Sequence, residues 1–254
     1  MAHETAAGNF AVIRLESVDS TNAEARRHIA VGATGVWVVA GRQTQGRGRR
    51  ARAWVSEPGN LYASHAFRPD CAPGRLGEYA FVAALALYDA VCVVCPAAGS
   101  HIALKWPNDL IAVDGKLSGI LLESESGGAG QALLLTIGWG VNCRHHPEGG
   151  DYPATDFASL GFDVAPQVLF DALRGAFERH ARILREDGMA AIRQAWLAHA
   201  RGVGQSITVR LEDRTLEGTF RDLDVDGRLI LEQPDGSRMK ISTGDVFFPG
   251  RAGR

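Results

Sequence analysis

The spacing of apolar residues changes after Gly204, and this change constrains the fold more than any other feature of the sequence. Before this glycine, the apolar residues of the last two long segments recur at helical spacing. After it, apolar residues such as Ile207 and Val209 alternate with polar ones, as in half-buried strands. Asp-Gly turns separate further short strands. The pattern predicts a larger domain, residues 1–203, and a small β-barrel, residues 204–254.

The larger domain mixes both periodicities. The run Val36–Ala40 is apolar throughout and indicates a buried strand, whereas the tract after Arg75 is apolar nearly all round, as in a helix packed under a sheet. Thr21 and Glu24 have the spacing of a capping box and predict a helix start. Together these segments predict an α+β fold, a mixed sheet flanked by helices. Strands are expected at 10–15, 36–40, 61–67, 102–106, 110–113, 119–123 and 133–142, and helices at 21–31, 75–94, 169–184 and 189–200.

Composition excludes several classes of protein. The chain has 254 residues, of which 46% are hydrophobic, and a formal net charge of −2. A disordered chain and a chain attracted as a whole to nucleic acid are therefore excluded. Residues 1–9 do not resemble a signal peptide, and the apolar tract Tyr79–Ala98 is interrupted by Asp89 and Pro96, which predicts a buried helix rather than a membrane span. Four cysteines are too few to staple this chain and predict reduced thiols in the cytoplasm.

The segment Gly41–Trp54, called the arginine segment below, is the most basic part of the chain. Its glycines let the backbone approach an anion, and its guanidinium groups offer paired donors that suit phosphate or carboxylate oxygens. Because these cations repel one another, we expect the segment to be mobile when empty and ordered around an anionic ligand. A solvated basic loop, or one that contacts nucleic acid, is the alternative. The residues concerned are Arg42, Gly46, Arg47, Gly48, Arg49, Arg50 and Arg52.

A second group of charged residues surrounds a predicted hairpin. The run Lys105–Asp109 ends one strand, and Lys116 follows the turn at Asp114-Gly115. Charges at the ends of buried strands are costly unless they pair with one another or with a ligand. A lysine here can hold a carboxylate and offset the charge of a phosphate, and Asp109 can act as a base toward an amine. A Lys–Asp pair that only holds the hairpin together is the alternative.

Two shorter motifs are less specific. Gly138–Asn142 closes a strand with glycines that admit a flat ligand and an asparagine that offers a donor and an acceptor, although a strand-end turn explains the same residues. Ser20-Thr21-Asn22 either caps a helix or faces a pocket. Cys92 and Cys95 have redox or zinc spacing but lack a second pair, so they predict buried structural thiols. No metal site is predicted.

Taken in this order, the motifs resemble those of the biotin–protein ligases. The resemblance covers residues 10–249. It implies a catalytic domain of the biotin-ligase and class II synthetase type, followed by an SH3-like barrel. It also implies a reaction in which the carboxylate of biotin joins the α-phosphate of ATP, pyrophosphate leaves, and biotinyl-5′-AMP passes biotin to one lysine of a biotin carboxyl carrier protein. The matching residues are Ser20–Asn22, Gly46–Arg50, Lys105–Asp109, Lys116–Leu121 and Gly138–Asn142.

The resemblance implies roles for individual residues. Lys116 would bridge the biotin carboxylate and the α-phosphate, and Arg49 would restrain the adenylate. Lys105 and Asp109 would lie where the carrier lysine arrives, and these four are the predicted catalytic residues. Trp54 would pack against adenine and Asn142 would hydrogen-bond it. The predicted biotin-binding residues are Ser20, Thr21, Asn22, Gln43, Gly46, Arg47, Lys116 and Gly119, and those for ATP or the adenylate are Arg49, Arg50, Trp54, Asn108, Lys116 and Asn142.

The same resemblance implies partners and a location. ATP and biotin are the expected substrates, with Mg²⁺ as helper. The carrier domain of acetyl-CoA carboxylase or of another carboxylase is the expected protein partner. Because so few residues precede the first predicted strand, we expect a ligase without an N-terminal DNA-binding domain, acting in the cytoplasm without DNA or membrane. The oligomeric state stays open between a monomer and a homodimer.

Two other functions compete with this interpretation. The nearest is a lipoate- or octanoate-transferring ligase of the same fold, although Gln43 together with Ser20 and Thr21 suits a ureido ring better than an aliphatic chain. The other is a nucleic-acid-binding protein that uses the arginine segment, which predicts steeply salt-dependent binding. That function leaves Lys116 and Asn142 without a role.

Overall fold

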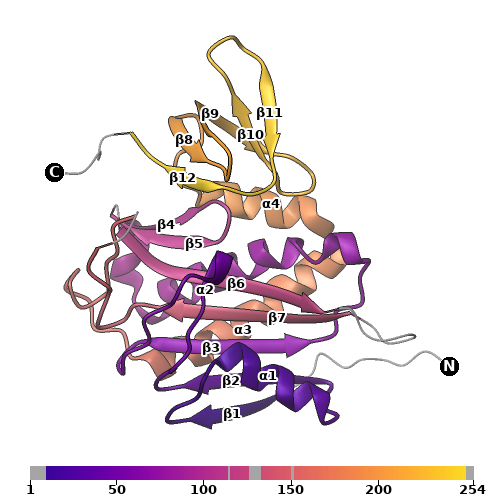
Figure 1. The fold of residues 1–254 in the computed structure, drawn as a ribbon, viewed down its shortest axis with the longest axis vertical. Helices are drawn as coiled ribbons and strands as arrows, with labels where there is room; N and C mark the ends of the chain where they lie inside the picture. Colours follow the sequence, from indigo (N-terminus) through magenta and orange to yellow (C-terminus); the bar gives the residue numbers. More distant parts are fainter. Residues whose placement is uncertain (1–9, 114, 126–132, 150–151, 250–254) are drawn as a thin grey trace.

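The computed structural model describes residues 10–113, 115–125, 133–149 and 152–249. Their larger part is a seven-stranded sheet of order β1-β2-β3-β7-β6-β5-β4 (Figure 1). β1 and β2 run parallel, and the other neighbouring strands run antiparallel, which confirms the predicted mixed sheet. The strands are β1 (Ala11–Leu15), β2 (Gly35–Ala40), β3 (Leu61–Phe67), β4 (Ile102–Lys105), β5 (Asp109–Ala112), β6 (Gly115–Glu125) and β7 (Leu134–Val141).

Both faces of this sheet are covered, because side chains along a strand point alternately to opposite faces. On β2, Val38 packs with Ile29 of α1 in a small apolar cluster, whereas its neighbour Trp37 belongs to the main core. Figure 1 shows α1 in front of the sheet and α2 and α3 behind it. The helices are α1 (Thr21–Ala30), α2 (Glu78–Val94), α3 (Pro166–Glu186) and α4 (Gly188–Ala198).

The start of α1 differs from the predicted capping box. Ser20 is the N-cap, and its Oγ accepts a hydrogen bond from the backbone N–H of Ala23 at 3.5 Å. Thr21 and Glu24 both lie inside the helix, so the predicted pairing of these two residues is wrong. Glu24 forms an ion pair with Arg27 at 2.5 Å instead. The cap therefore comes from the residue just before the predicted one, and this leaves Thr21 in the first helical turn.

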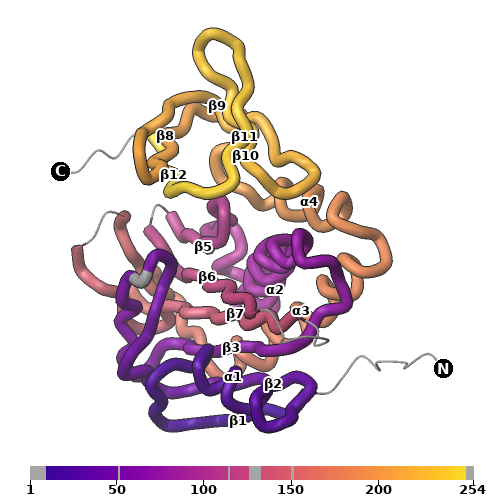
Figure 2. The backbone as a smooth tube through the Cα atoms, turned by 45° about the vertical axis from the view of Figure 1, so that its right-hand side comes forward, coloured from indigo at the N-terminus to yellow at the C-terminus, as the bar shows by residue number. Residues whose placement is uncertain are grey.

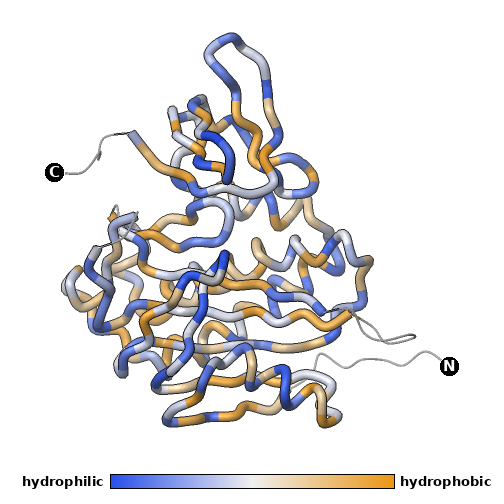
Figure 3. The backbone as a smooth tube through the Cα atoms, in the orientation of Figure 1, coloured by the Kyte–Doolittle hydropathy of each residue, from blue (hydrophilic) through white to orange (hydrophobic). Residues whose placement is uncertain are grey.

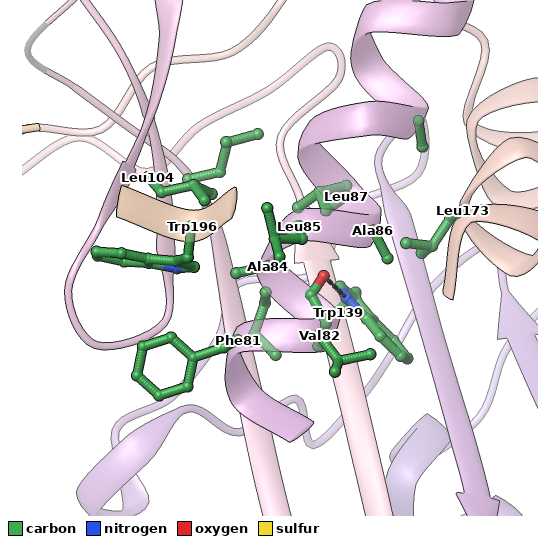
Figure 4. Packing of buried hydrophobic residues seen from close by; sticks show 14 of the residues in the cluster. Phe81, Val82, Ala84, Leu85, Ala86, Leu87, Leu104, Trp139, Leu173 and Trp196 are labelled. Carbon is green, nitrogen blue, oxygen red and sulfur yellow. Dashed lines mark hydrogen bonds between the residues drawn. The ribbon is translucent and has the colours of Figure 1, made fainter. Parts of the chain in front are cut away.

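α2 is the central helix of the core. Its segment Phe81–Leu87 is buried on every side, and Figure 4 shows these side chains packed between Trp196, Leu173 and Trp139. Trp139 also donates its indole N–H to the carbonyl of Ala83 at 3.2 Å. By length and composition alone the stretch Pro73–Val94 could cross a membrane, but more than half of its most apolar part is buried inside the structure. This burial confirms the predicted core helix.

A five-stranded antiparallel sheet of order β11-β10-β9-β8-β12 follows α4. Both Figure 1 and Figure 2 show it beside the β4 and β5 end of the larger sheet. Figure 3 shows that the tip of its β10–β11 hairpin is hydrophilic. The short strands predicted after Gly204 are thus confirmed, while the domain boundary after residue 203 stays a prediction. They are β8 (Ser206–Arg210), β9 (Thr215–Leu223), β10 (Leu229–Glu232), β11 (Arg238–Ile241) and β12 (Asp245–Phe247).

Close contacts join the two sheets. Trp106 donates its indole N–H to the carbonyl of Gly227 at 3.0 Å. Gly227 has φ 79°, and a Cβ on it would lie 2.4 Å from the ring of Phe81, so only glycine permits this approach. The linker after α4 pairs with the outer edge of β4, where the backbone of Leu104 bonds to His199 at 2.9 Å and to Arg201 at 2.8 Å. These bonds cover a sheet edge and fix the C-terminal sheet beside the site.

Candidate active site

A pocket of about 330 Å³ opens where the first turn of α1, the arginine segment and the ends of β5, β6 and β7 meet. The C-terminal sheet contributes Asp245, at the start of β12, to its wall. Of the residues predicted for the site, Gly46, Arg50 and Lys105 are not among those that line it. The predicted residues that do line it are Ser20, Thr21, Asn22, Gln43, Arg47, Arg49, Trp54, Asn108, Asp109, Lys116, Gly119 and Asn142.

One end of the pocket is a hydrogen-bonded polar network. Thr21 donates its backbone N–H and its hydroxyl to Gln43 Oε1, at 2.9 and 3.0 Å. Gln43 Nε2 donates to Ser56 Oγ at 3.1 Å. The single hydroxyl proton of buried Ser64 is shared between Thr21 Oγ1 at 2.7 Å and Asn22 Oδ1 at 2.6 Å. Each polar side chain is therefore held in one orientation before a ligand arrives.

Asn22 supports this end of the pocket from behind. Its Nδ2 donates to Glu123 Oε2 at 2.7 Å, and its Oδ1 accepts from Ser64. A Cβ on Gly138 would lie 2.3 Å from Asn22 Oδ1, so the space above Gly138 is filled by Asn22. The amide is hydrogen-bonded at both ends, so it positions the first turn of α1, and its predicted contact with biotin stays a prediction.

The floor of the pocket is a pair of glycines covered by tryptophan. Gly119 and Gly140 are direct neighbours across β6 and β7. A Cβ on Gly140 would lie 2.5 Å from Trp54 Cε2, and one on Gly119 would lie 3.0 Å from Trp54 Cζ3. The flat group that these glycines admit is thus the protein's own indole. Its buried Nε1 has no hydrogen-bond partner among the described residues, which costs about 1–3 kcal/mol.

Asp109 lies between the two predicted catalytic lysines. Its carboxylate oxygens are 3.2 Å from Lys105 Nζ and 2.7 Å from Lys116 Nζ. Burial raises the pKa of Asp109, but the two ammonium groups outweigh burial and hold its pKa below the usual range. Asp109 is therefore an anion and a weak base at neutral pH. Of the two roles left open by the sequence, the structure supports pairing with lysine.

The two lysines differ in what they can reach. Lys105 is only 4% exposed, and the ring of Tyr152 covers its ammonium at 4.3 Å. Burial lowers the pKa of Lys105 against the opposing effect of Asp109. The side chain of Lys116 is 30% exposed and lines the pocket. Lys116 thus lines the pocket, whereas Lys105 is a buried partner of Asp109; its predicted place near the arriving carrier lysine stays a prediction.

The arginine segment forms a short closed loop over the pocket. An isolated bridge joins Arg47 to Ala53, and Trp54 donates its N–H to the carbonyl of Gly46 at 2.9 Å. A Cβ on Gly46 would lie 2.4 Å from the carbonyl oxygen of Trp54, so Gly46 is needed to close the loop. Its predicted contact with biotin stays a prediction. The predicted ordering of the segment around an anion concerns motion and stays a prediction.

Acidic side chains hold the arginines of this loop. Arg47 Nη2 lies 3.6 Å from Glu123 Oε1, at the polar end of the pocket. Arg50, predicted to bind nucleotide, is not among the residues that line the pocket, but its guanidinium lies 3.6 Å from Asp245 of the pocket wall and 3.8 Å from Glu212. Its backbone has a φ of 55°, in the left-handed region.

The two asparagines predicted to bind nucleotide form hydrogen bonds within the protein. Asn108 Oδ1 accepts from Arg49 Nη1 at 3.2 Å, and Asn108 Nδ2 donates to the carbonyl of Ile120. Asn142 Nδ2 donates to the carbonyl of Thr155 at 3.0 Å and to that of Lys116 at 3.4 Å, which uses both of its protons. No hydrogen bond between described residues uses Asn142 Oδ1, so a ligand can meet this asparagine only as an acceptor.

Five polar residues of the site were missed by sequence reasoning. They lie outside the motifs, and long-range packing brings them to the pocket. Only Ser64 left a signal, since it interrupts the apolar run of β3. The missed residues are Ser56, Ser64, Glu123, Tyr152 and Asp245.

The pocket does not fit a resident metal ion. No group of three or more His, Cys, Asp or Glu side chains that could hold a metal lies within the part of the chain that the structure describes. The carboxylates in the pocket wall, Asp109 and Asp245, are bound to lysines and arginines respectively. A divalent ion would therefore have to arrive with ligands of its own.

Comparison with known proteins agrees with this geometry. Residues 14–142 match the model of the biotin/lipoate A/B protein ligase family, and residues 202–248 match that of the biotin protein ligase C-terminal domain. The chain is 41% identical over 244 residues to a biotin–acetyl-CoA-carboxylase ligase from Paracoccus denitrificans, covering 93% of this chain and 100% of that protein. A bifunctional ligase/repressor from Bacillus subtilis is 30% identical, over 84% of this chain and 66% of that protein.

The fold is also shared with a solved structure. It is similar to a biotin protein ligase from Aquifex aeolicus in complex with biotin and ATP, with a TM-score of 0.78 and 25% identity, covering 93% of this chain and 97% of that one. The family model spans about half of the chain, and the Paracoccus relative is matched over its whole length. This chain belongs to the biotin/lipoate A/B protein ligase family.

Proposed function

We propose that the chain is a biotin–protein ligase. It activates biotin with ATP to biotinyl-5′-AMP and transfers the biotinyl group to a lysine of a biotin carboxyl carrier domain, as in acetyl-CoA carboxylase. The observation that carries this proposal is the place of Lys116: its ammonium lines one pocket together with the polar Thr21–Gln43 network and the arginine segment. The 41% identity to a ligase of this name supports the choice of substrate.

Lys116 is the group that would bring the two substrates together. A carboxylate and a triphosphate repel each other, so their junction needs a preorganised cation. In the first step a carboxylate oxygen of biotin attacks the α-phosphorus of ATP, a new P–O bond forms, and pyrophosphate leaves with the electrons of the broken bond. Negative charge accumulates around the phosphorus, and Lys116 is the lysine of the pocket placed to offset it.

The polar network and the tryptophan would bind the two ends of the adenylate. Ser20, Thr21 and Gln43 present fixed donors and acceptors, which suits the ureido ring of biotin. Trp54 would pack against adenine, and its unpartnered N–H would gain an acceptor in the ligand or in water. Asn142 would accept a hydrogen bond from the adenine amino group. Arg49 and Arg47 would cover the adenylate and exclude water from it.

In the second step the amine of the carrier lysine attacks the acyl carbon and AMP leaves. The lysine reaches the protein as an ammonium ion and must lose a proton before it attacks. Asp109 and the two ammonium groups beside it, Lys105 and Lys116, together carry a net positive charge. This charge disfavours an ammonium ion here and favours the neutral amine of the carrier lysine, whose proton passes to water. The lowered pKa of Asp109 makes it a weak base, so its role would be to hold Lys105 and Lys116 in place rather than to take up the proton.

The setting of the reaction follows from the same residues. Mg²⁺ would enter as the complex of ATP, with the phosphates as its ligands, because the pocket carboxylates are already paired. We place the protein in the cytoplasm, where ATP is supplied and where its four free cysteines stay reduced. A homodimer joined at the edge of β1 that pairs with no other strand of the described residues would be recognised by analytical ultracentrifugation.

Biotin-dependent exchange of labelled pyrophosphate into ATP tests the first step. We expect exchange with biotin and none without it. Calorimetric titration then separates the alternative from the same family. Heat from biotin and none from lipoate supports a biotin ligase, whereas tight lipoate binding without a biotin signal would assign the pocket to lipoate or octanoate. Steeply salt-dependent retention of DNA or RNA in a filter-binding assay would instead support the nucleic-acid function.

A further inference from the structure

Three arginines of the arginine segment converge on one carboxylate of the C-terminal sheet. Asp245 Oδ2 lies 3.2 Å from Arg52 Nη2 and 3.6 Å from Arg50 Nη1, and its Oδ1 lies 4.0 Å from Arg49 Nη1. The side chain of Asp245 is 22% exposed and forms part of the pocket wall. A carboxylate from the C-terminal sheet therefore holds the loop that covers the pocket.

The residues before Asp245 strengthen this contact. Arg49 Nη2 donates to Thr243 Oγ1 at 3.1 Å and reaches the carbonyl of Gly244 at 3.5 Å. A Cβ on Gly244 would lie 2.8 Å from Val209 Cγ1, so glycine is needed for the turn to pack this closely on β8. Three consecutive residues thus bind the arginine segment, and Arg49 joins them to Asn108 on the other side of the pocket.

The charges in this cluster do not balance. Three guanidinium groups face Asp245, and the second acid near them, Glu212, is 82% exposed and 3.8 Å from Arg50. The cluster therefore keeps a surplus of positive charge at the pocket wall and attracts a further anion. A polyphosphate offers more charge and more acceptor oxygens than one carboxylate, so it can replace Asp245 as the partner of these arginines.

We propose that Asp245 is a positioning residue that holds the arginine segment closed over the pocket, and that phosphate groups of the bound nucleotide take over its arginines. That these phosphates belong to a bound nucleotide rests on the proposed function. The contact between Asp245 and the arginine segment does not depend on it. The C-terminal sheet thereby helps to cover the site. It does so by holding the arginine segment, and its own residues need not touch biotin.

Limited proteolysis tests this proposal, because trypsin cleaves after arginine only where the chain opens. Cleavage after Arg47, Arg49, Arg50 and Arg52 is followed by mass spectrometry in the full chain, without biotin or carrier. In Asp245→Asn we expect cleavage on the order of tenfold faster than in the wild type, from the loss of three partly exposed ion pairs. Asp245→Glu should restore protection, and millimolar pyrophosphate should restore it in Asp245→Asn by supplying the missing negative charge.

The matched control is Glu232→Gln. Glu232 also binds two arginines of the C-terminal sheet, Arg221 at 2.6 Å and Arg238 at 3.1 Å. Its loss should leave cleavage of the arginine segment unchanged. The proposal would be overturned if Asp245→Asn were cleaved no faster than the wild type, or if Glu232→Gln were cleaved as fast as Asp245→Asn. It would also be overturned if pyrophosphate did not protect Asp245→Asn from cleavage. A failed pyrophosphate exchange in the wild type would overturn the proposed function alone, because the proteolysis needs no catalysis.

Discussion

Replacement of Lys116 by alanine should stop formation of the adenylate while biotin still binds. Lys116 is the lysine in the pocket wall, and its ammonium lies 2.7 Å from Asp109 and 5.7 Å from the centre of the Trp54 ring. The polar network that would hold the ureido ring does not include it. The two ends of the pocket are separate, so the variant should lose activation and keep recognition.

The size of the effect follows from charge and distance. Two unit charges about 4 Å apart interact by roughly 4 kcal/mol at an effective dielectric constant of about 20. The Lys116 side chain is 30% exposed, and water weakens this attraction. We therefore expect activation to slow by about 10²- to 10³-fold, which corresponds to about 2.7–4 kcal/mol. Asp109 keeps Lys105 as a partner in the variant, so the fold should persist.

The assay is biotin-dependent pyrophosphate exchange, with biotin binding measured by calorimetry on the same sample. Lys240→Ala is the matched control: it also removes one ammonium, which lies 3.3 Å from Asp224 in the C-terminal sheet. The control should exchange pyrophosphate like the wild type. Exchange at the wild-type rate in Lys116→Ala would refute the reasoning, and so would complete loss of biotin binding with an unchanged melting temperature.

Two further predictions concern the core and the floor of the pocket. Burial lowers the pKa of His65 from 6.5 to about 3, so the unfolded chain takes up this proton first as the pH falls. As the pH falls from ~6 to ~4, this group should lower the free energy of unfolding by about 1.4 kcal/mol per pH unit. His65→Phe should remove this contribution in denaturation experiments carried out at a series of fixed pH values. An unchanged pH dependence in the variant would contradict the assignment to His65. Gly140→Ala should weaken adenylate binding at least tenfold, because its Cβ would displace the Trp54 indole, whereas Gly175→Ala, in open space on α3, should bind normally. Equal binding by both variants would show that the indole position is unimportant.

The elements of this fold were predictable where one local rule decided them. The run Val36–Ala40 is apolar throughout, and the segment Leu134–Val141 ends in a motif with glycines, so both strands could be located from sequence. The helix start at Thr21 was placed correctly for a wrong reason, because Ser20 supplies the cap. Local spacing therefore located the elements, while the hydrogen bonds at their ends depended on side-chain geometry.

The site was predictable as a set of motifs but not as a set of contacts. Which flat group lies over Gly140 depends on the pairing of β6 with β7 and on the path of the arginine segment. Likewise, the choice of Asp245 as partner of the arginines depends on the packing of two sheets, and no spacing in the sequence encodes it. For the same reason Lys105 and Lys116, alike in sequence, differ in the structure through the cover that Tyr152 gives to one of them.

Mass spectrometry of a carrier domain tests the central claim most directly. The full chain is incubated with biotin, magnesium, ATP and a biotin carboxyl carrier domain, and the mass of the carrier is followed. We predict that one biotinyl group appears on one carrier lysine, only when ATP is present. A carrier that stays unmodified while the chain is folded, or one that accepts a lipoyl or octanoyl group but no biotin, would contradict the account.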